Sequence, residues 1–506
     1  MFTCLKVNSL TLNLQWYWNR YPGARTDVES YVYRYSFDDE LLKNAKWKEN
    51  YLIQPEIEEY FQTVAKKYDL YRHIQFNAEL KDAIWDDEKN LWNVKVSTGE
   101  EFTVRYIVAA VGILHSKHLP EIPGLKSFKG QVAHSAAWKP ELEYDNKRVA
   151  VIGSGASGVQ LVSALGEKAK TLTHFIRHAQ YVIPTSFRTV SPEERKLIND
   201  RYDKIWHQVF TSIAGMGFPE PNRPTFSVSP EDRETIFQDL WEQGSGFRFL
   251  FGGFSDLVSN PDANREAIKF IHRKIYEIVK NDEKAAPLIS QDFFARRPLT
   301  DDKYYYRFAQ DNISAVDLKK TPIESITPNG IKTSDGTEYP LDLIVFATGF
   351  DAVEGSYLRI NFRGRNGLPL KDYWADGPKS SLGATAAGFP NLFFVNGPGT
   401  AFSNNAPVTE EGARFATSII AHSEELRKKG TTKGTAGSTE QFDNEWVDNI
   451  TKVADATLFS KTPSWFFGNE VPGKKAAARF YFGGLGHFRA LLADSRAKGY
   501  PGFTFA

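Results

Sequence analysis

The chain has 506 residues, of which 62 are acidic and 62 are basic. This balance argues against nucleic acid or an anionic membrane as the main partner. No apolar run in the sequence reaches the roughly 18 residues that a bilayer-spanning helix needs. The single cysteine, Cys4, cannot form an internal disulfide, a redox pair or a zinc knuckle. We expect a cytoplasmic protein with no membrane span, no metal site and no nucleic-acid partner, and take it to be a monomer or a weak oligomer.

Strand-like apolar runs alternate with helical stretches along the chain, a pattern typical of α/β proteins with parallel sheets. Three of these runs are rich in Val, Ile and Ala and contain a glycine at or near their end, as buried parallel strands often do: 105–114, 148–158 and 342–350. Between about 190 and 285 the sequence turns helical, and Ser191 and Ser229 each precede Pro and an acidic residue, the signature of a helix start. We interpret 190–285 as a helical insertion in an α/β domain.

One glycine-rich loop has the context of a dinucleotide site. It lies between a predicted strand at 149–152 and a predicted helix at 159–169, and a second strand is predicted at 171–176. In such a βαβ unit, glycines permit a tight turn and let backbone N–H groups reach a pyrophosphate at the helix N-terminus. The predicted dinucleotide-binding residues are Gly153, Ser154, Gly155, Ala156, Ser157 and Gly158. A plain glycine-rich turn is the alternative.

The residues after the second strand distinguish the nucleotide. An NAD site usually has a carboxylate there for the ribose 2′-hydroxyl, whereas this chain has Arg177 and His178. Because a guanidinium suits a 2′-phosphate, we predict NADPH rather than NADH. An ordinary surface arginine is the alternative.

An aromatic segment near the start of the chain is a second candidate site. Residues 16–27, WYWNRYPGARTD, contain four aromatic rings, two arginines and a terminal aspartate. Rings can stack on a flat cofactor, and arginines can pair with phosphates. A surface turn without a ligand is the alternative.

Further sequence motifs resemble those of one protein family. Phe128, Gly130, His134 and Trp138 fit the pattern FxGxxxHxxxW, the fingerprint of the flavin-dependent Baeyer–Villiger monooxygenases. The segment 16–27 resembles the FAD-loop motif of the same family. Three more pieces agree with it: ATGFDA at 347–352, GPG at 397–399 and SWFFGNEVPGK at 464–474. These motifs occur in the family's order from Trp16 to the C-terminus.

The resemblance implies an α/β fold with two interleaved dinucleotide-binding, Rossmann-like domains. The FAD-binding domain would combine an N-terminal part, 1–113, with a C-terminal part, 351–506. The NADPH-binding domain, with its helical insertion at about 190–285, would occupy 114–350. In the implied reaction NADPH reduces FAD, and one oxygen atom of O₂ is inserted next to a ketone carbonyl to give an ester or lactone. The 14% aromatic content is compatible with a bulky cyclic or polyketide-like ketone of secondary metabolism.

The resemblance also assigns roles to matching residues. Arg297 stands at the place of the family's catalytic arginine, a permanent cation that would stabilise anionic oxygen atoms, and Asp27 would hold it in place. Arg296 and Arg177 would bind the 2′-phosphate, and Trp465 would lie in a loop that closes on NADP⁺. His134 is interpreted as structural. The positions predicted to bind FAD are Trp16, Tyr17, Trp18, Arg25, Thr26, Asp27, Tyr33 and the backbone of Leu80.

Two departures from the family pattern leave alternatives open. Lys139, directly after Trp138, is more typical of sister flavin monooxygenases that oxidise nitrogen and sulfur atoms. The first strand, glycine loop and second strand of the FAD domain have no counterpart in the sequence as given. The alternatives are therefore an N- or S-oxygenating enzyme, or a truncated relative, impaired or non-enzymatic, that binds NADPH but not FAD. A flavin disulfide reductase is excluded because it needs a cysteine pair.

From the second departure we expect the 506-residue chain to bind FAD weakly. Each charge-assisted hydrogen bond to the pyrophosphate contributes about 1.5–3 kcal/mol, so several missing bonds reduce the affinity by orders of magnitude. The flavin absorbance of the purified protein, compared with its protein concentration, measures this. A yellow protein with near-stoichiometric flavin contradicts the expectation.

Overall fold

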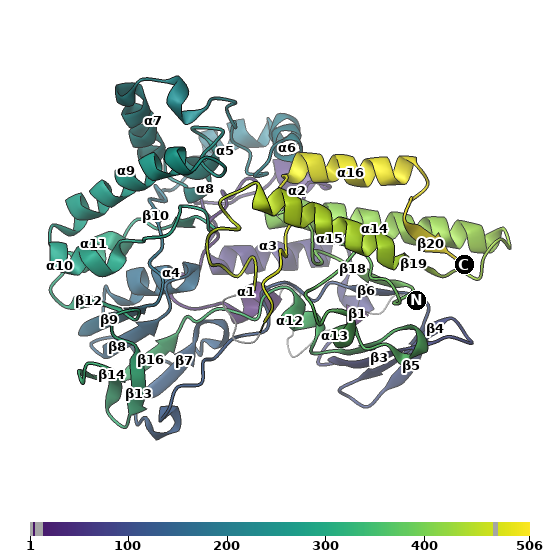
Figure 1. Ribbon diagram of the computed structural model, residues 1–506, viewed down its shortest axis with the longest axis horizontal. Coiled ribbons are helices and arrows are strands. Elements are labelled where there is room, and N and C mark those ends of the chain that lie inside the picture. The colour runs from purple at the N-terminus through teal and green to yellow at the C-terminus, as the bar shows by residue number, and fades with distance from the viewer. Residues whose placement is uncertain (1–3, 6–13, 469–473) are drawn as a thin grey trace.

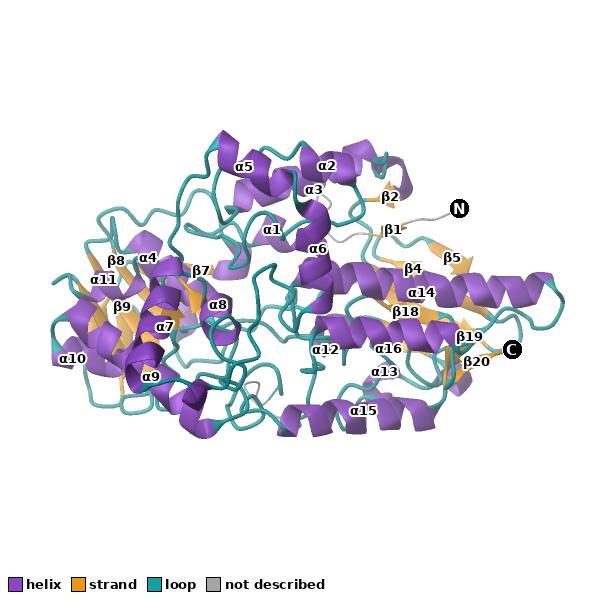
Figure 2. Cartoon of the chain, turned by 90° about the horizontal axis from the view of Figure 1, so that it is seen from above, coloured by secondary structure: helices purple, strands orange, loops and turns teal. Residues whose placement is uncertain are grey.

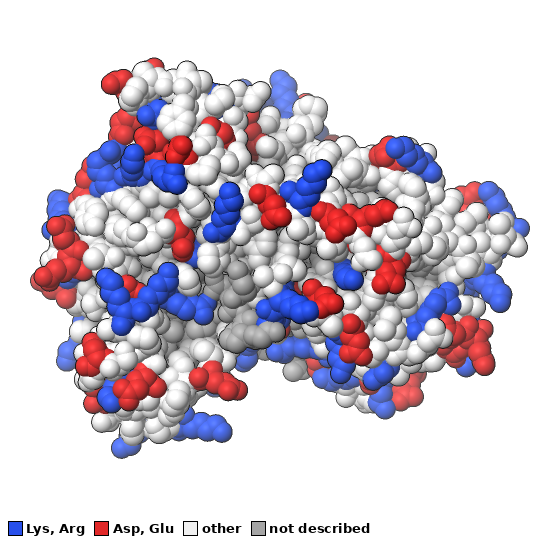
Figure 3. All heavy atoms as spheres, in the orientation of Figure 1, with Lys and Arg blue, Asp and Glu red and all other residues white. Residues whose placement is uncertain are grey.

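The computed structural model describes residues 4–5, 14–468 and 474–506 (Figure 1). The middle of the 464–474 motif therefore lies outside the described residues. Within the described part of the chain, no helix is both long enough and apolar enough to cross a membrane. On the face drawn in Figure 3, acidic and basic side chains are intermixed, consistent with the equal numbers of the two charges in the sequence.

One lobe is built on a five-stranded sheet in which all neighbouring strands are parallel. Val149 and Val151 face the large hydrophobic core, whereas Ala150 and Ile152 face a second cluster on the other side of the sheet. Because both faces are covered, the strands are continuously apolar rather than alternating. The strand order is β12 (Ile313–Asp317), β9 (Thr171–Ile176), β8 (Arg148–Ile152), β16 (Leu343–Phe346) and β7 (Gln131–His134).

The connections of this sheet cover its two faces. Helix α4 (Ala156–Leu165) joins β8 to β9 and contributes to the large core. A small antiparallel sheet contributes Ile326 and Ile331 to the second cluster. Its strands are β13 (Ile323–Thr327), β14 (Gly330–Thr333) and β15 (Glu338–Pro340).

A run of helices stands between β9 and β12, at the upper left in Figure 1. Both predicted helix starts are confirmed, because Ser191 accepts a hydrogen bond from the Glu194 N–H and Ser229 accepts one from the Asp232 N–H, each at 3.1 Å. The helices are α5 (Pro192–Asn199), α6 (Tyr202–Thr211), α7 (Pro230–Gln243), α8 (Gly246–Phe251), α9 (Pro261–Val279) and α10 (Asp282–Ala285). The chain returns to the sheet through β11 (Leu299–Thr300), which pairs with β10 (Val182–Ile183), and through α11 (Tyr304–Phe308).

The other lobe takes its strands from both ends of the chain. Strand β6 (Ile107–Ala109) pairs in parallel with β18 (Leu392–Phe394), and β3 (Leu80–Asp86) pairs in parallel with β17 (Asn361–Arg363). The chain thus leaves this lobe after β6, builds the first lobe and returns, so the two α/β domains are interleaved. The lobe also contains β1 (Cys4–Leu5), β2 (Ile74–Gln75), β4 (Leu91–Val96), β5 (Glu101–Val104), β19 (Ala436–Ser438) and β20 (Phe503–Phe505).

Long helices run lengthwise along this lobe, as Figure 2 shows for α14 (Asn405–Lys428), α15 (Glu440–Asp455) and α16 (Leu485–Ala497). Of the predicted strand at 105–114, only β6 is extended in a ladder. Its backbone pairing ends where the Val395 N–H donates to the Ala109 carbonyl. The remaining helices are α1 (Leu14–Trp18), α2 (Asp39–Lys43), α3 (Gln54–Lys67), α12 (Glu354–Tyr357) and α13 (Leu370–Tyr373).

Asp443 on α15 ties several segments of this lobe together. Its side chain is fully buried, and burial raises its pKa. It accepts hydrogen bonds of 2.5–2.8 Å from four donors in three segments: Ser381 Oγ, Ser438 Oγ, Tyr373 Oη and the Ala387 N–H.

We expect Asp443→Ala to lower the free energy of unfolding by about 3 kcal/mol or more, because it leaves several buried donors without an acceptor. Asp448→Ala, at an exposed position of the same helix, is the control and should change it by less than about 0.5 kcal/mol. Denaturant titration measures both variants. Equal stabilities of the two variants contradict the role of Asp443.

Candidate active site

The glycine loop between β8 and α4 has the geometry of a dinucleotide cradle. Gly153 has φ +108°, and a Cβ atom there would collide with the Ala347 carbonyl. A Cβ atom at Gly158 would collide with the Gly153 carbonyl, so both positions need glycine for close packing. Gly155 caps α4, and no atom lies within 4 Å of where its Cβ would be. The helix N-terminus therefore meets open space that a pyrophosphate can fill.

The end of β9 is held against this loop. The Ser154 hydroxyl donates to the His178 carbonyl at 2.6 Å, and the Gly153 N–H donates to the Phe175 carbonyl at 3.0 Å. Arg177 is exposed at the same strand end, whereas His178 is half-buried. The structure thus brings the predicted Arg177 and His178 next to the predicted loop.

Arg296 joins the same end of the sheet. Its buried guanidinium donates to Asp292 Oδ2 at 2.7 Å and to the Pro463 carbonyl at 2.7 Å, and its Nη2 lies 3.4 Å from His178 Nδ1. The hydrogen bond from His178 and the charge of Arg296 hold the pKa of Asp292 below its ordinary value. Arg296 therefore already has a carboxylate partner within the protein.

Trp465 lies two residues after the Pro463 carbonyl that Arg296 holds. Its ring contacts Phe466 and Phe480, with centroids 4.7 and 5.4 Å away. The segment that carries Trp465 is thus fastened to the predicted 2′-phosphate cluster through Arg296.

The aromatic segment places Trp16, in α1, against Tyr33. Trp16 Nε1 donates to Tyr33 Oη at 3.2 Å, and burial raises the pKa of Tyr33 to about 12. Tyr17 and Trp18 stack edge to face with centroids 5.1 Å apart. Four of the predicted FAD positions therefore form two ring pairs at the start of the chain.

Asp27 and Arg297, far apart in sequence, form an ion pair. The distance from Arg297 Nη2 to Asp27 Oδ2 is 2.5 Å, and the side chains are 32% and 11% exposed, respectively. The backbone before Asp27 is fixed because the Thr26 N–H donates to the Leu52 carbonyl and Thr26 Oγ1 accepts from the Val28 N–H, each at 3.0 Å. The predicted pair is therefore in place, with the cation partly accessible.

The aromatic segment also docks on α4. Tyr21 Oη donates to Gln160 Oε1 at 2.8 Å, and Gln160 Nε2 donates to the Arg25 carbonyl at 3.2 Å. Gly23 approaches so closely that a Cβ atom would lie 2.9 Å from the Gln160 carbonyl oxygen. Gln160 was not predicted as a site residue; a buried amide on a mostly apolar helix is the signal that could have indicated it.

The described residues include polar atoms that suit a flavin cofactor. Arg25 Nε is buried without a hydrogen-bond partner within the described part of the chain, and its guanidinium lies over the Phe187 ring at 4.6 Å. Gly112, just beyond the carboxyl end of β6, has φ +78° and open space around it. Ligands of α/β sheets bind at such strand ends. Arg25 and the neighbouring aromatic rings therefore fit the side of FAD that the resemblance assigns to them.

Leu80 is separate from these residues. It begins β3 and packs beside a hydrophobic cluster formed by Trp85, Trp92 and Phe362, whereas Trp16 belongs to another cluster. No hydrogen bond or ring contact described for these residues joins Leu80 to the aromatic segment. Its prediction as an FAD position stays a prediction.

His134 has the structural environment expected of it. Its ring is buried, Nδ1 accepts from the Ala136 N–H at 3.1 Å, and Nε2 lies 3.2 Å from the His118 carbonyl oxygen. Burial lowers its pKa, which favours the neutral ring.

A cluster of phenylalanine rings forms around Phe402, in the loop after the GPG motif. Its centroid lies 4.5 Å from that of Phe466 and 6.4 Å from that of Phe247 on α8. Phe459 and Phe482 stack on each other in the same cluster at 4.8 Å. The rings come from the helical insertion and from the C-terminal part, so they bridge the two lobes.

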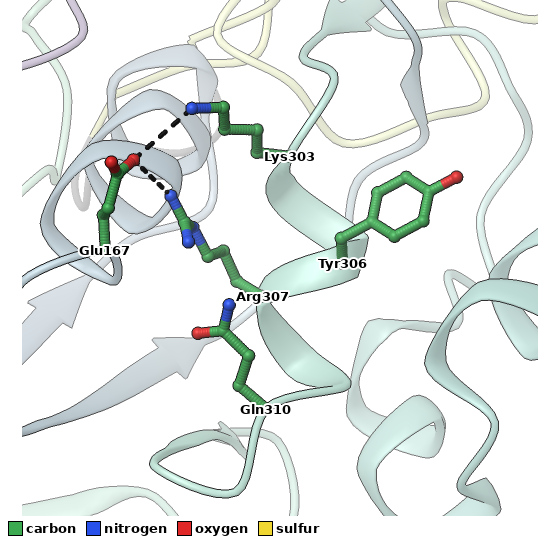
Figure 4. Close-up of a pocket in the computed structure, with 5 residues that line it drawn as sticks. All are labelled: Glu167, Lys303, Tyr306, Arg307 and Gln310. Atoms are coloured by element: carbon green, nitrogen blue, oxygen red, sulfur yellow. Dashed lines mark hydrogen bonds and ion pairs between the residues drawn. The ribbon is translucent and has the colours of Figure 1, made fainter.

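Figure 4 shows a surface pocket of about 350 Å³ at the far end of α4. Glu167 pairs there with Arg307 at 2.8 Å and with Lys303 at 3.4 Å, so each of the three charged groups has a partner of opposite charge. Because the glycine loop is at the opposite end of α4, this pocket is separate from the dinucleotide cradle.

Within the described residues, no cluster of His, Cys, Asp and Glu side chains suits a metal ion.

The chain matches the family model "FMO-like: Flavin-binding monooxygenase-like" over residues 37–215. It is 41% identical to a Baeyer-Villiger monooxygenase from Pseudooceanicola batsensis over 488 residues, which cover 96% of this chain and 88% of that protein. It is 42% identical to a phenazine N-monooxygenase from Lysobacter antibioticus, over 96% and 89% of the two chains. The solved structure of cyclohexanone monooxygenase from Rhodococcus sp. Phi1 bound to NADP⁺ is similar with a TM-score of 0.96 at 42% identity, covering 99% of this chain and 93% of that one.

These similarities extend over both interleaved domains rather than over a single motif. The chain therefore belongs to the flavin-binding monooxygenases of the Baeyer–Villiger type, whose cofactors are FAD and NADPH.

Proposed function

We propose that this chain inserts one oxygen atom of O₂ next to a ketone carbonyl, giving an ester or lactone, with NADPH as the reductant. The observation that carries the proposal is the partly exposed ion pair of Asp27 and Arg297. FAD, when bound, supplies the activation of O₂. The protein's own residues bind the nucleotides, orient the ketone and stabilise negative charge.

Arg297 is the catalytic residue of this proposal. Arginine is a permanent cation in proteins, so a guanidinium at this place can stabilise the oxyanion that develops on the ketone carbonyl. Asp27 fixes the orientation of the guanidinium through the 2.5 Å contact. Arg297 keeps about a third of its surface accessible, so it can contact a substrate without losing its partner.

The NADPH site in this proposal has two parts. The glycine loop and the α4 N-terminus receive the pyrophosphate, and Arg177 with the Arg296 cluster receives the 2′-phosphate. The charge of Arg296 is already countered by Asp292 at 2.7 Å, so part of its attraction for the phosphate is offset within the protein.

The substrate is proposed to be a bulky cyclic ketone. The phenylalanine rings around Phe402 offer an apolar wall between the lobes, and a relative of known structure is named as a cyclohexanone monooxygenase. Apolar rings favour a hydrophobic ring system over a charged or small polar ketone.

We propose that the protein works in the cytoplasm and is a monomer or a weak oligomer.

Arg297→Ala should abolish ester formation from a cyclic ketone while leaving NADP⁺ binding nearly unchanged. A single electrostatic contact of this kind contributes about 10²- to 10³-fold to kcat. Product analysis by gas chromatography, in assays with excess FAD, measures the loss. Arg265→Ala, on the exposed face of α9, is the matched control. Undiminished ester formation by Arg297→Ala removes Arg297 from its role.

Arg177→Ala should raise the KM for NADPH about tenfold or more and change the KM for NADH little, because only NADPH carries the 2′-phosphate. Steady-state kinetics with both nucleotides measures the two effects, again with Arg265→Ala as the control. Equal effects on both nucleotides contradict the 2′-phosphate assignment.

A second candidate function is oxygenation of a ring nitrogen. The 42% identity to a phenazine N-monooxygenase favours it, and Lys139 agrees with it. Parallel assays with cyclohexanone and with phenazine separate the two functions, because one yields a lactone and the other an N-oxide. N-oxide as the sole product overturns the ketone proposal.

A further inference from the structure

His174 is a polar residue in the middle of the buried strand β9. Its side chain is completely buried among apolar neighbours, and no role in the proposed reaction uses it. Its Nε2 lies 3.0 Å from the carbonyl oxygen of Gly153, the first glycine of the cradle. Its Nδ1 lies 3.2 Å from the hydroxyl of Tyr304 on α11.

These two contacts define the tautomer of His174. A carbonyl oxygen can only accept, so Nε2 carries the proton and donates to Gly153. Nδ1 then accepts a hydrogen bond from the Tyr304 hydroxyl. Burial lowers the pKa of His174 to about 4, so the ring is neutral at physiological pH and has one donor and one acceptor. Both are used.

The Gly153 carbonyl matters because of the peptide plane to which it belongs. The Gly153 C=O and the Ser154 N–H lie in one rigid plane and point in opposite directions. Gly153 has no side chain to restrict this plane, and its φ of +108° lies in a region that only glycine adopts readily. A hydrogen bond from His174 to the carbonyl therefore also sets the direction of the Ser154 N–H in the cradle.

Tyr304 is itself held in place by several bonds. Asp301 Oδ1 accepts the N–H groups of Lys303 at 2.8 Å and Tyr304 at 2.9 Å, and it accepts the Ser163 hydroxyl of α4 at 2.5 Å. The ion pairs of Glu167 with Lys303 and Arg307, drawn in Figure 4, fasten α11 to the end of α4. These bonds hold α11 in place, so the Tyr304 hydroxyl has a fixed position next to His174.

We propose that His174 is a positioning residue for NADPH: its Nε2–H fixes the Gly153 carbonyl, so that the glycine loop presents its N–H groups to the pyrophosphate, and Tyr304 selects the tautomer that can donate. This inference rests on the nucleotide site of the proposed function. It concerns the pyrophosphate end of that site, whereas Arg177 and Arg296 concern the 2′-phosphate.

Two variants of the full chain separate the hydrogen bond from the packing. His174→Phe keeps an aromatic ring beside Tyr304 and Phe308 but has no donor. His174→Gln places an amide N–H near the position of Nε2. Calorimetric titration uses two probes: NADP⁺, which has the pyrophosphate, and adenosine 2′-monophosphate, which lacks it.

His174→Phe should raise the Kd for NADP⁺ about three- to tenfold, the effect of one hydrogen bond, and leave the Kd for adenosine 2′-monophosphate unchanged. His174→Gln should restore most of the affinity for NADP⁺. In assays of ketone oxidation, His174→Phe should raise the KM for NADPH with little change in kcat.

Three results would overturn the inference. One is an unchanged Kd for NADP⁺ in His174→Phe, and another is an equal loss of affinity for both probes, which indicates general damage to the domain. The third, an unmodified chain that does not bind NADP⁺, overturns the proposed function as well. An unmodified chain that binds NADP⁺ but oxidises no ketone overturns only the proposed function.

Discussion

The ion pair of Asp27 and Arg297 is the interaction on which the arrangement of the site depends. Its two residues lie far apart in sequence, so the 2.5 Å contact depends on how the aromatic segment packs against the segment that carries Arg297. The backbone before Asp27 is fixed by the bond of Thr26 to the Leu52 carbonyl, and Gln160 fixes the preceding turn on α4. The Asp27 carboxylate, which must face Arg297, is thus positioned by neutral backbone and amide hydrogen bonds. Such bonds are insensitive to pH and weakly affected by salt.

Helix α4 organises the nucleotide end of the same site. Its N-terminus faces the open side of the glycine loop, its Gln160 receives the aromatic segment, and its end carries Glu167, which fastens α11. This ten-residue helix therefore contacts the glycine loop, the segment that ends in Asp27 and the support of Tyr304. This explains why several contacts of α4 are polar even though most of its surface lies in the core.

Local pattern predicted the elements of this region well and their long-range contacts poorly. Strand β9 has the predicted bounds, because a buried parallel strand is a continuous apolar run. Helix α4 begins at Ala156, earlier than the predicted 159, because Gly158 serves close packing inside the first turn rather than ending the loop. The predicted strand at 105–114 is limited to Ile107–Ala109, since its length depends on a partner almost 300 residues away in sequence, β18 at Leu392–Phe394. For the same reason, sequence periodicity could not indicate that His174 meets Tyr304.

Two consecutive arginines connect the two ends of the site. Arg296 contacts Asp292 and the Pro463 carbonyl, whereas Arg297 contacts Asp27, so the two neighbouring side chains have different partners. The cluster that is proposed to receive the 2′-phosphate is thus one peptide bond away from the proposed catalytic cation. Because the Pro463 carbonyl precedes Trp465 by two residues, Arg296 also ties the segment that carries Trp465 to the same place in the structure.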